Sequence, residues 1–215
     1  MASAEAFAVG SPGLPAGMPR DAVGYDINLC EAPIVSLKLS DSDIKALKGN
    51  PDVVAVEDDG LAHALPMESF AYEGQPRLQA EIFFTGVQQI KAPPVWGCSR
   101  GRGIQVAVLD TGIDSTHPDL AANAKGAVSF VPGETPMDGN SHRTRCAGTI
   151  GSAINGAAIN GNGVVGVAPE ALPYGVKVLA SSGAGQYSWT IAGINWAIQN
   201  KMRVVSGPDT RAAPE

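Results

Sequence analysis

An apolar run that stops at a carboxylate constrains this chain more than any other stretch. Residues 106–109 read Val-Ala-Val-Leu, which is too short for a typical helix and rich in β-branched side chains. Such a run predicts a strand buried on both faces of a parallel sheet. It ends at Asp110, and open α/β sheets place their chemistry at the carboxyl ends of such strands. Asp110 is therefore a candidate catalytic residue, although an aspartate here could also only cap the following turn.

A histidine marks the second informative segment. Residues 140–149 read Asn-Ser-His-Arg-Thr-Arg-Cys-Ala-Gly-Thr, and the small side chains after His142 favour a closely packed helix. A neutral imidazole accepts a proton near neutral pH, so His142 is a candidate general base. A carboxylate hydrogen-bonded to its other ring nitrogen would fix the tautomer and stabilise the imidazolium. Asp110 is the candidate for that carboxylate.

These two segments resemble the blocks of the subtilisin-like serine proteases. In that family an Asp-Ser/Thr-Gly block follows a buried strand, and a Gly-His-Gly-Thr-His-Val/Cys-Ala-Gly-Thr block opens a helix. Residues 80–93 are also similar to the mature amino terminus of bacterial subtilisins. The resemblance implies that Asp110 and His142 are the catalytic aspartate and histidine of a serine endopeptidase. It also implies an α/β fold, with a parallel sheet and flanking helices, preceded by part of a small α+β propeptide domain.

The chain departs from the family pattern in three places. Arg143 and Arg145 replace a glycine and the second histidine of the block, and residues 206–215 diverge from the family's Asn-Met-Ser-Leu-Gly-Gly. The family blocks with the oxyanion-hole asparagine and the nucleophilic serine are not found. We therefore expect a chain truncated before the catalytic serine, inactive alone and prone to aggregate, because half a sheet leaves apolar faces bare. The alternative is a non-catalytic pseudoprotease or fragment that at most binds peptide or propeptide.

The domain organisation follows from composition and from the same resemblance. Residues 1–33 have no clear period and predict an irregular leader, and residues 66–79 predict a linker with the processing region. Residues 34–65 predict a strand, a helix capped at Ser40 and a second strand. They resemble the carboxyl half of the subtilisin propeptide, whose tail passes through the active site. Residues 80–206 are expected to form the first part of the peptidase domain, and residues 207–215 a divergent tail.

The second half of the chain alternates predicted strands and helices, which favours a parallel sheet. Strands are expected at 106–109, at 176–179 and from 204, and a helix is expected to start at His142. A second, amphipathic helix is expected over 188–202. Its candidate core residues are Trp189, Ile191, Ile194, Trp196 and Ile198.

Two further sites are implied by the resemblance. Gly183, Ala184 and Gly185 match the strand that pairs with the substrate backbone, and glycines permit close approach of another main chain. An ordinary turn is the alternative. A structural Ca²⁺ would be bound by oxygens of the residues at family ligand positions, where a Gly/Asn-rich turn is the alternative. These positions are Glu81, Asp119 and Asn160.

Composition argues against several other classes of protein. A net charge of −6 and a pI near 5.0 give no general attraction to nucleic acid or to acidic membranes. No apolar stretch is long enough to span a bilayer, and the amino end lacks the basic segment of a signal peptide, although the family is largely secreted. Cys30, Cys98 and Cys146 lack metal-ligand spacing, and Cys146 is expected to be a packed residue rather than a nucleophile. The expected partners are a polypeptide substrate and the chain's own propeptide.

Overall fold

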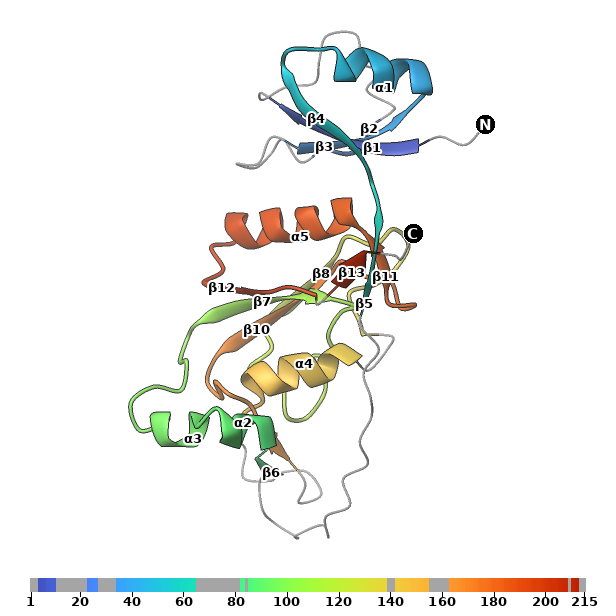
Figure 1. Cartoon of the computed structure of the whole chain (residues 1–215). Helices are drawn as coiled ribbons and strands as arrows, with labels where there is room; N and C mark the ends of the chain where they lie inside the picture. The colour runs from blue at the N-terminus through green and yellow to red at the C-terminus, as the bar shows by residue number, and fades with distance from the viewer. Residues whose placement is uncertain are drawn as a thin grey trace.

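The computed structural model describes residues 4–10, 23–26, 34–64, 82–83, 85–138, 142–154, 163–208 and 210–212. A small sheet carrying α1 (Asp41–Lys48) lies above α5 (Tyr187–Gln199), which covers a larger sheet (Figure 1). The chain passes from the small sheet into β5 (Leu61–Ala64), which lies beside the larger unit. Among the residues described, no helix has the length and apolarity to cross a membrane.

The small sheet is antiparallel, with the strand order β2-β3-β1-β4. It contains β1 (Ala4–Gly10), β2 (Val23–Asp26), β3 (Ile34–Leu39) and β4 (Val53–Asp58). Helix α1 begins as predicted after Ser40, which forms a capping box with Asp43. Its Leu47 packs with Val35, Leu37 and Leu39 of β3 in one buried cluster.

The prediction of an irregular leader over residues 1–33 is wrong at β1 and β2. Strand β1 occupies a central position and pairs with both β3 and β4. Its sequence, Ala-Glu-Ala-Phe-Ala-Val-Gly, has little intrinsic strand preference. Strand formation depends strongly on partners, and two hydrogen-bonded neighbours outweigh the weak local signal here.

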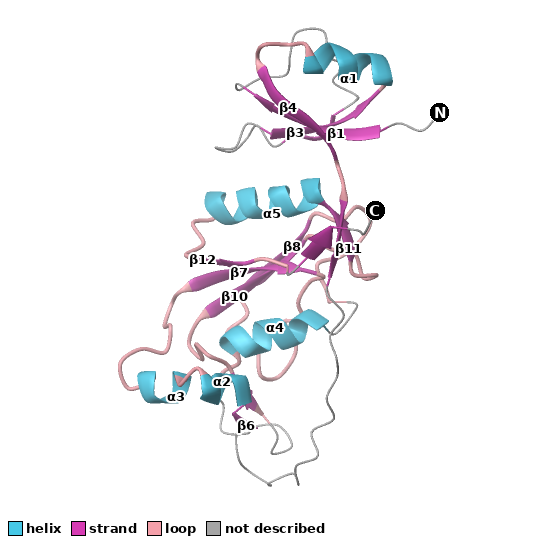
Figure 2. Ribbon diagram, viewed as in Figure 1, coloured by secondary structure: helices cyan, strands magenta, loops and turns pink. Residues whose placement is uncertain are grey.

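The larger sheet is parallel, with the order β12-β7-β10-β8, as the alternation of elements predicts. Helix α4 (His142–Gly151) and α5 lie on opposite faces of it (Figure 2). The four strands are β7 (Gln105–Asp110), β8 (Gly126–Ser129), β10 (Leu172–Lys177) and β12 (Val204–Ser206). The strand predicted over 176–179 starts earlier and ends at Lys177. The amides of Val178 and Leu179 both donate to the carbonyl of Asp110.

Short elements complete the fold. They are β6 (Ile82–Phe83), α2 (Thr85–Gln89), α3 (Ala92–Val95), β9 (Val164–Val165), β11 (Ala184–Gln186) and β13 (Thr210–Ala212). Strand β6 pairs in parallel with β9. Strands β11 and β13 pair antiparallel with the two sides of β5, which is therefore the middle strand of a three-stranded sheet.

The predicted core face of α5 is partly wrong. Ile194 and Ile198 are 41% and 47% exposed, whereas Trp189 and Trp196 do pack against the core. The helix buries small side chains instead, namely Ser188, Ala192, Gly193, Asn195 and Ala197. A Cβ at Gly193 would lie only 2.6 Å from Cγ1 of Val178, so the helix approaches the sheet too closely for larger residues.

Candidate active site

Asp110 is the last residue of β7 and is fully buried at the carboxyl edge of the sheet. Its Oδ1 accepts a hydrogen bond of 2.7 Å from the backbone N–H of Thr111. Its carbonyl accepts from Val178 and Leu179, which fixes the strand end from the β10 side. Both kinds of contact hold the carboxylate where the sequence pattern predicts chemistry.

Asp138 connects this strand end to the helix that carries His142. Its Oδ1 accepts from the Thr111 hydroxyl at 3.0 Å, and its Oδ2 accepts from the Thr144 N–H at 3.0 Å and the Thr144 hydroxyl at 2.9 Å. The carboxylate thereby caps the first turn of α4, where the helix dipole favours a negative charge. The α4 helix begins at His142 as predicted, while the side chains of His142 and Arg143 lie outside the described part of the chain.

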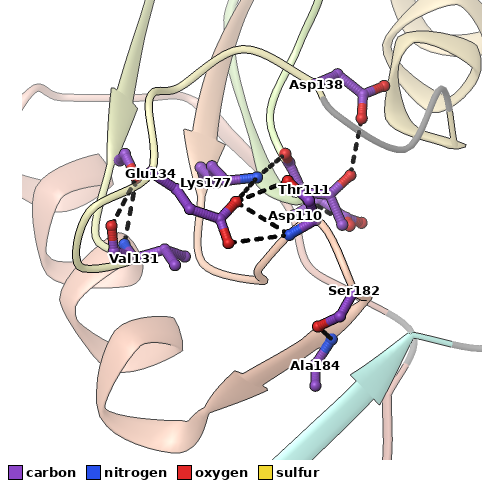
Figure 3. Close-up of polar contacts among 10 residues, drawn as sticks. Asp110, Thr111, Val131, Glu134, Asp138, Lys177, Ser182 and Ala184 are labelled. Carbon is purple, nitrogen blue, oxygen red and sulfur yellow. Dashed lines mark hydrogen bonds and ion pairs between the residues drawn. The ribbon is translucent and has the colours of Figure 1, made fainter.

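An ion pair between a buried lysine and a half-buried glutamate lies on the other side of the same strand end (Figure 3). Lys177 is fully buried, and its Nζ donates to the carbonyl of Thr111 at 2.5 Å and lies 3.2 Å from Oε2 of Glu134. The carboxylate of Glu134 in turn accepts from the N–H and the hydroxyl of Ser181 at 3.0 and 2.7 Å. Sequence reasoning missed this ion pair. The signal that could have indicated it is Lys177 inside a predicted buried strand, because a buried charge needs a partner.

Glu134 is expected to make stability depend on acid. Hydrogen bonds from Ser181, with the Lys177 ammonium nearby, hold the pKa of Glu134 below its ordinary value. A carboxyl whose pKa is lowered by folding stabilises the fold above its ordinary pKa of about 4.3, and that contribution is lost as the pH falls through the lowered pKa. Urea unfolding at several acidic pH values should show a shallower pH dependence for Glu134→Gln than for the wild type. Equal slopes would contradict this.

The predicted peptide-binding segment pairs with another part of the chain. In β11, Ala184 and Gly185 lie opposite His63 and Ala62 of β5, and the Ala64 N–H donates to the Gly183 carbonyl at 2.8 Å. Gly183 itself has a φ of +85°, so it forms the turn that precedes the strand. A Cβ at Gly185 would collide with the Val178 carbonyl, and this explains the glycine. Residues 183–185 therefore contain both of the predicted structures, a turn at Gly183 and a strand that begins at Ala184.

Residues just before β5 cap the amino end of α5. Asp59 Oδ1 accepts from the Ser188 N–H at 3.0 Å, and the Gly60 carbonyl accepts from the Tyr187 N–H at 3.1 Å. The N-cap residue Gln186 makes no side-chain cap of its own. The cap is supplied from 129 positions away in the sequence, and it aligns β5 with β11.

We expect Asp59→Ala to lower the free energy of unfolding by about 1 kcal/mol, because an N-cap acceptor is lost. Urea unfolding of the full chain measures this. The matched control is Asp58→Ala, which removes the exposed neighbouring carboxylate of β4. Similar losses in both variants would contradict the capping role.

The proposed metal ligands and the cysteines are only partly described. Asp119 is buried, and its Oδ2 accepts from the Val164 N–H at 3.1 Å, whereas Glu81 and Asn160 lie outside the described residues. Within the described ranges, no group of three His, Cys, Asp or Glu side chains could hold a metal ion. Cys98 and Cys146 form no disulfide within the part of the chain that the structure describes. Cys30 also lies outside the described residues.

Comparison with known proteins identifies the lineage of this site. The sequence model of the Subtilase family matches residues 101–207, which include β7, α4, β10, β11 and α5. This segment belongs to the subtilase family. The chain is 47% identical over 171 residues to Subtilisin E of Bacillus subtilis (strain 168), covering 78% of this chain and 39% of that protein. The resemblance inferred from the Asp110 and His142 blocks is thus confirmed.

Other relatives of the subtilase segment agree. Subtilisin of Bacillus pumilus is 53% identical over 124 residues, covering 56% of this chain and 42% of that protein. An Intracellular serine protease of Paenibacillus polymyxa is 49% identical over 126 residues, covering 56% and 37%. The chain therefore spans about two fifths of the length of these subtilase relatives. The predicted α/β fold class is confirmed.

Proposed function

We propose that the protein containing this chain is a subtilisin-type serine endopeptidase that hydrolyses polypeptides. In this proposal the Asp110 carboxylate accepts the Nδ1–H of His142, and Nε2 of His142 removes the proton from a serine hydroxyl. The serine oxygen then attacks the peptide carbonyl, and the peptide C–N bond breaks as His142 gives its proton to the leaving amine. Water hydrolyses the resulting acyl-enzyme and releases the serine. We assign this nucleophile to no serine of the present chain. The protease relatives favour this function over a non-catalytic peptide-binding fragment.

The observation that carries the proposal is the pairing of β5 with β11. An extended segment of four residues lies antiparallel to residues 184–186, and the adjoining strand β10 is in register with β7 up to Asp110. Main-chain pairing of this kind is a general way to bind peptides. We propose that Gly183, Ala184 and Gly185 bind the substrate backbone in the same way.

The same pairing supports an inhibitory role for the amino-terminal part. Residues 61–64 occupy the proposed substrate position, so we propose that the small antiparallel sheet and β5 form the chain's own propeptide. Processing would fall in residues 66–79, between this unit and a peptidase domain that starts near residue 80. Residues 207–215 would be a separate tail. We further propose that the mature protein acts outside the cell, as secreted members of the family do.

Labelling with a fluorophosphonate probe tests the proposed chemistry. We expect the protein containing this chain to be labelled at a single serine and to cleave a quenched fluorogenic peptide. His142→Ala should abolish both, because the serine loses its base. Folded protein that shows neither labelling nor cleavage would contradict the endopeptidase proposal.

We also propose that Glu81, Asp119 and Asn160 bind a structural Ca²⁺, at the positions that the family resemblance implies. Asp119 fits this role in part, because its buried carboxylate supplies the kind of oxygen ligand that Ca²⁺ prefers. Adding Ca²⁺ to chelator-treated protein should raise the unfolding temperature, and Asp119→Asn should remove that increase. An equal increase in both proteins would contradict the assignment.

A further inference from the structure

We propose that Glu134 and Lys177 are positioning residues that couple the Asp110 strand end to the peptide-binding strand β11. This inference rests on the proposed function, since it concerns the two halves of that same site. Glu134 follows β8 and Lys177 ends β10, so neither belongs to the segments that they connect. Figure 3 shows the Glu134 carboxylate between the Lys177 ammonium and the loop that leads to β11.

On the Asp110 side, the contact is made by Lys177. It lies opposite Asp110 in the parallel register of β10 and β7, and its Nζ donates to the carbonyl of Thr111, the next residue. A fully buried ammonium is stable only when it is paired and hydrogen-bonded. The position of Thr111, and with it the Asp110 carboxylate that its N–H contacts, therefore depends on a correctly placed Lys177.

On the peptide side, the contact is made by Ser181. Its N–H and hydroxyl both donate to Glu134, and Ser181 starts the tight turn that leads into β11. That turn is closed by hydrogen bonds of 2.8 Å from Gly183 to Ala180 and from Ala180 to Ala184. Its Gly183 carbonyl is the acceptor for Ala64 of β5.

The Glu134 carboxylate thus pairs with the buried Lys177 ammonium and also accepts hydrogen bonds from Ser181, in the loop that contacts β5. Charge-assisted hydrogen bonds are stronger and shorter than neutral ones, and they fix geometry as well as energy. If Lys177 is removed, Glu134 is no longer fixed from the Asp110 side and holds Ser181 less well. A change at Lys177 should therefore weaken the β5–β11 pairing, although no hydrogen bond or ion pair of the described residues joins Lys177 to β5.

Amide hydrogen exchange of the full chain, resolved by residue with NMR, tests this coupling. The Ala64 N–H reports on the β5–β11 edge, and the Ala107 N–H in β7 reports on opening of the large sheet. We expect Lys177→Met and Ser181→Ala each to raise the exchange rate at Ala64 about tenfold, the size expected for a charged hydrogen bond. Ala107 should change little. The double variant should exchange no faster than the faster single variant, because both changes break one linkage.

The control is Glu170→Gln, which removes a carboxylate paired with Arg100 and Arg102 away from this network. This variant should leave the exchange rate of the Ala64 N–H unchanged. If Lys177→Met does not fold, Glu134→Gln replaces it, since glutamine keeps the shape and loses the charge. The proposal would be overturned if the exchange rate of the Ala64 N–H did not change, or if that of the Ala107 N–H rose equally. It would also be overturned if the increases of the two single variants multiplied in the double variant. These readouts need no catalysis, so they are independent of whether a serine is labelled.

Discussion

Replacing Asp110 with asparagine is expected to lower turnover of the protein by a factor on the order of 10⁴, which is the size of loss known for the aspartate of serine protease triads, subtilisin included. Asparagine fills the same buried space at the end of β7. It removes the negative charge that would orient His142 and stabilise its imidazolium. Turnover of a quenched fluorogenic peptide at saturating concentration measures the effect.

The control for this variant is Asp114→Asn, four positions further on. Asp114 is half-buried, and its Oδ1 accepts from the N–H and the hydroxyl of Thr116, a local turn that an asparagine can keep. Its activity should stay close to that of the wild type. Comparable activity of Asp110→Asn and Asp114→Asn would show that the β7 carboxylate has no special role.

Replacing Gly166 with alanine is expected to cost about 3 kcal/mol of unfolding free energy, the upper end for overpacking. A Cβ at Gly166 would lie 2.7 Å from each of three backbone atoms, namely the Gly148 carbonyl oxygen and the amide nitrogens of Gly151 and Ser152. Backbone cannot rotate away as a side chain does, so the carboxyl end of α4 would have to move. Urea unfolding with a constant slope measures the loss.

Gly86→Ala serves as the comparison, because Gly86 lies in α2 and its Cβ would meet no atom within 4 Å. This replacement should be neutral or stabilising by up to about 1 kcal/mol, since alanine favours helices. If Gly166→Ala changed the free energy of unfolding as little as Gly86→Ala, that would contradict the close packing of α4 against residues 164–166.

Local patterns in the sequence predicted the framework of the molecule correctly. The apolar run before Asp110, the cap at Ser40 and the start of α4 at His142 are each determined by residues within one turn or one strand. Strands β1 and β2 were missed because their stability comes from pairing with distant strands. The buried face of α5 was misjudged because small residues set a close helix–sheet distance.

Contacts within the candidate site were hardest to predict. Glu134 and Ser181 are 47 positions apart, and Thr111 and Asp138 are 27 apart. No periodicity connects such pairs, because each hydrogen bond depends on where the sheet brings two loops together. The sequence hints at these contacts only through Lys177, a charge inside a predicted buried strand, and Asp138, an acidic residue shortly before α4.

Whether Asp110 and His142 form a hydrogen-bonded pair can be measured most directly by NMR of the imidazole protons in a chain with ¹⁵N-labelled histidine. The chain has only three histidines, His63, His117 and His142, so single replacements assign every signal. We predict one ring N–H signal, shifted downfield and protected from exchange, that belongs to His142 and disappears in Asp110→Asn. A folded chain in which the His142 ring resembles free histidine, and does not respond to Asp110→Asn, would contradict the pair and the proposed mechanism.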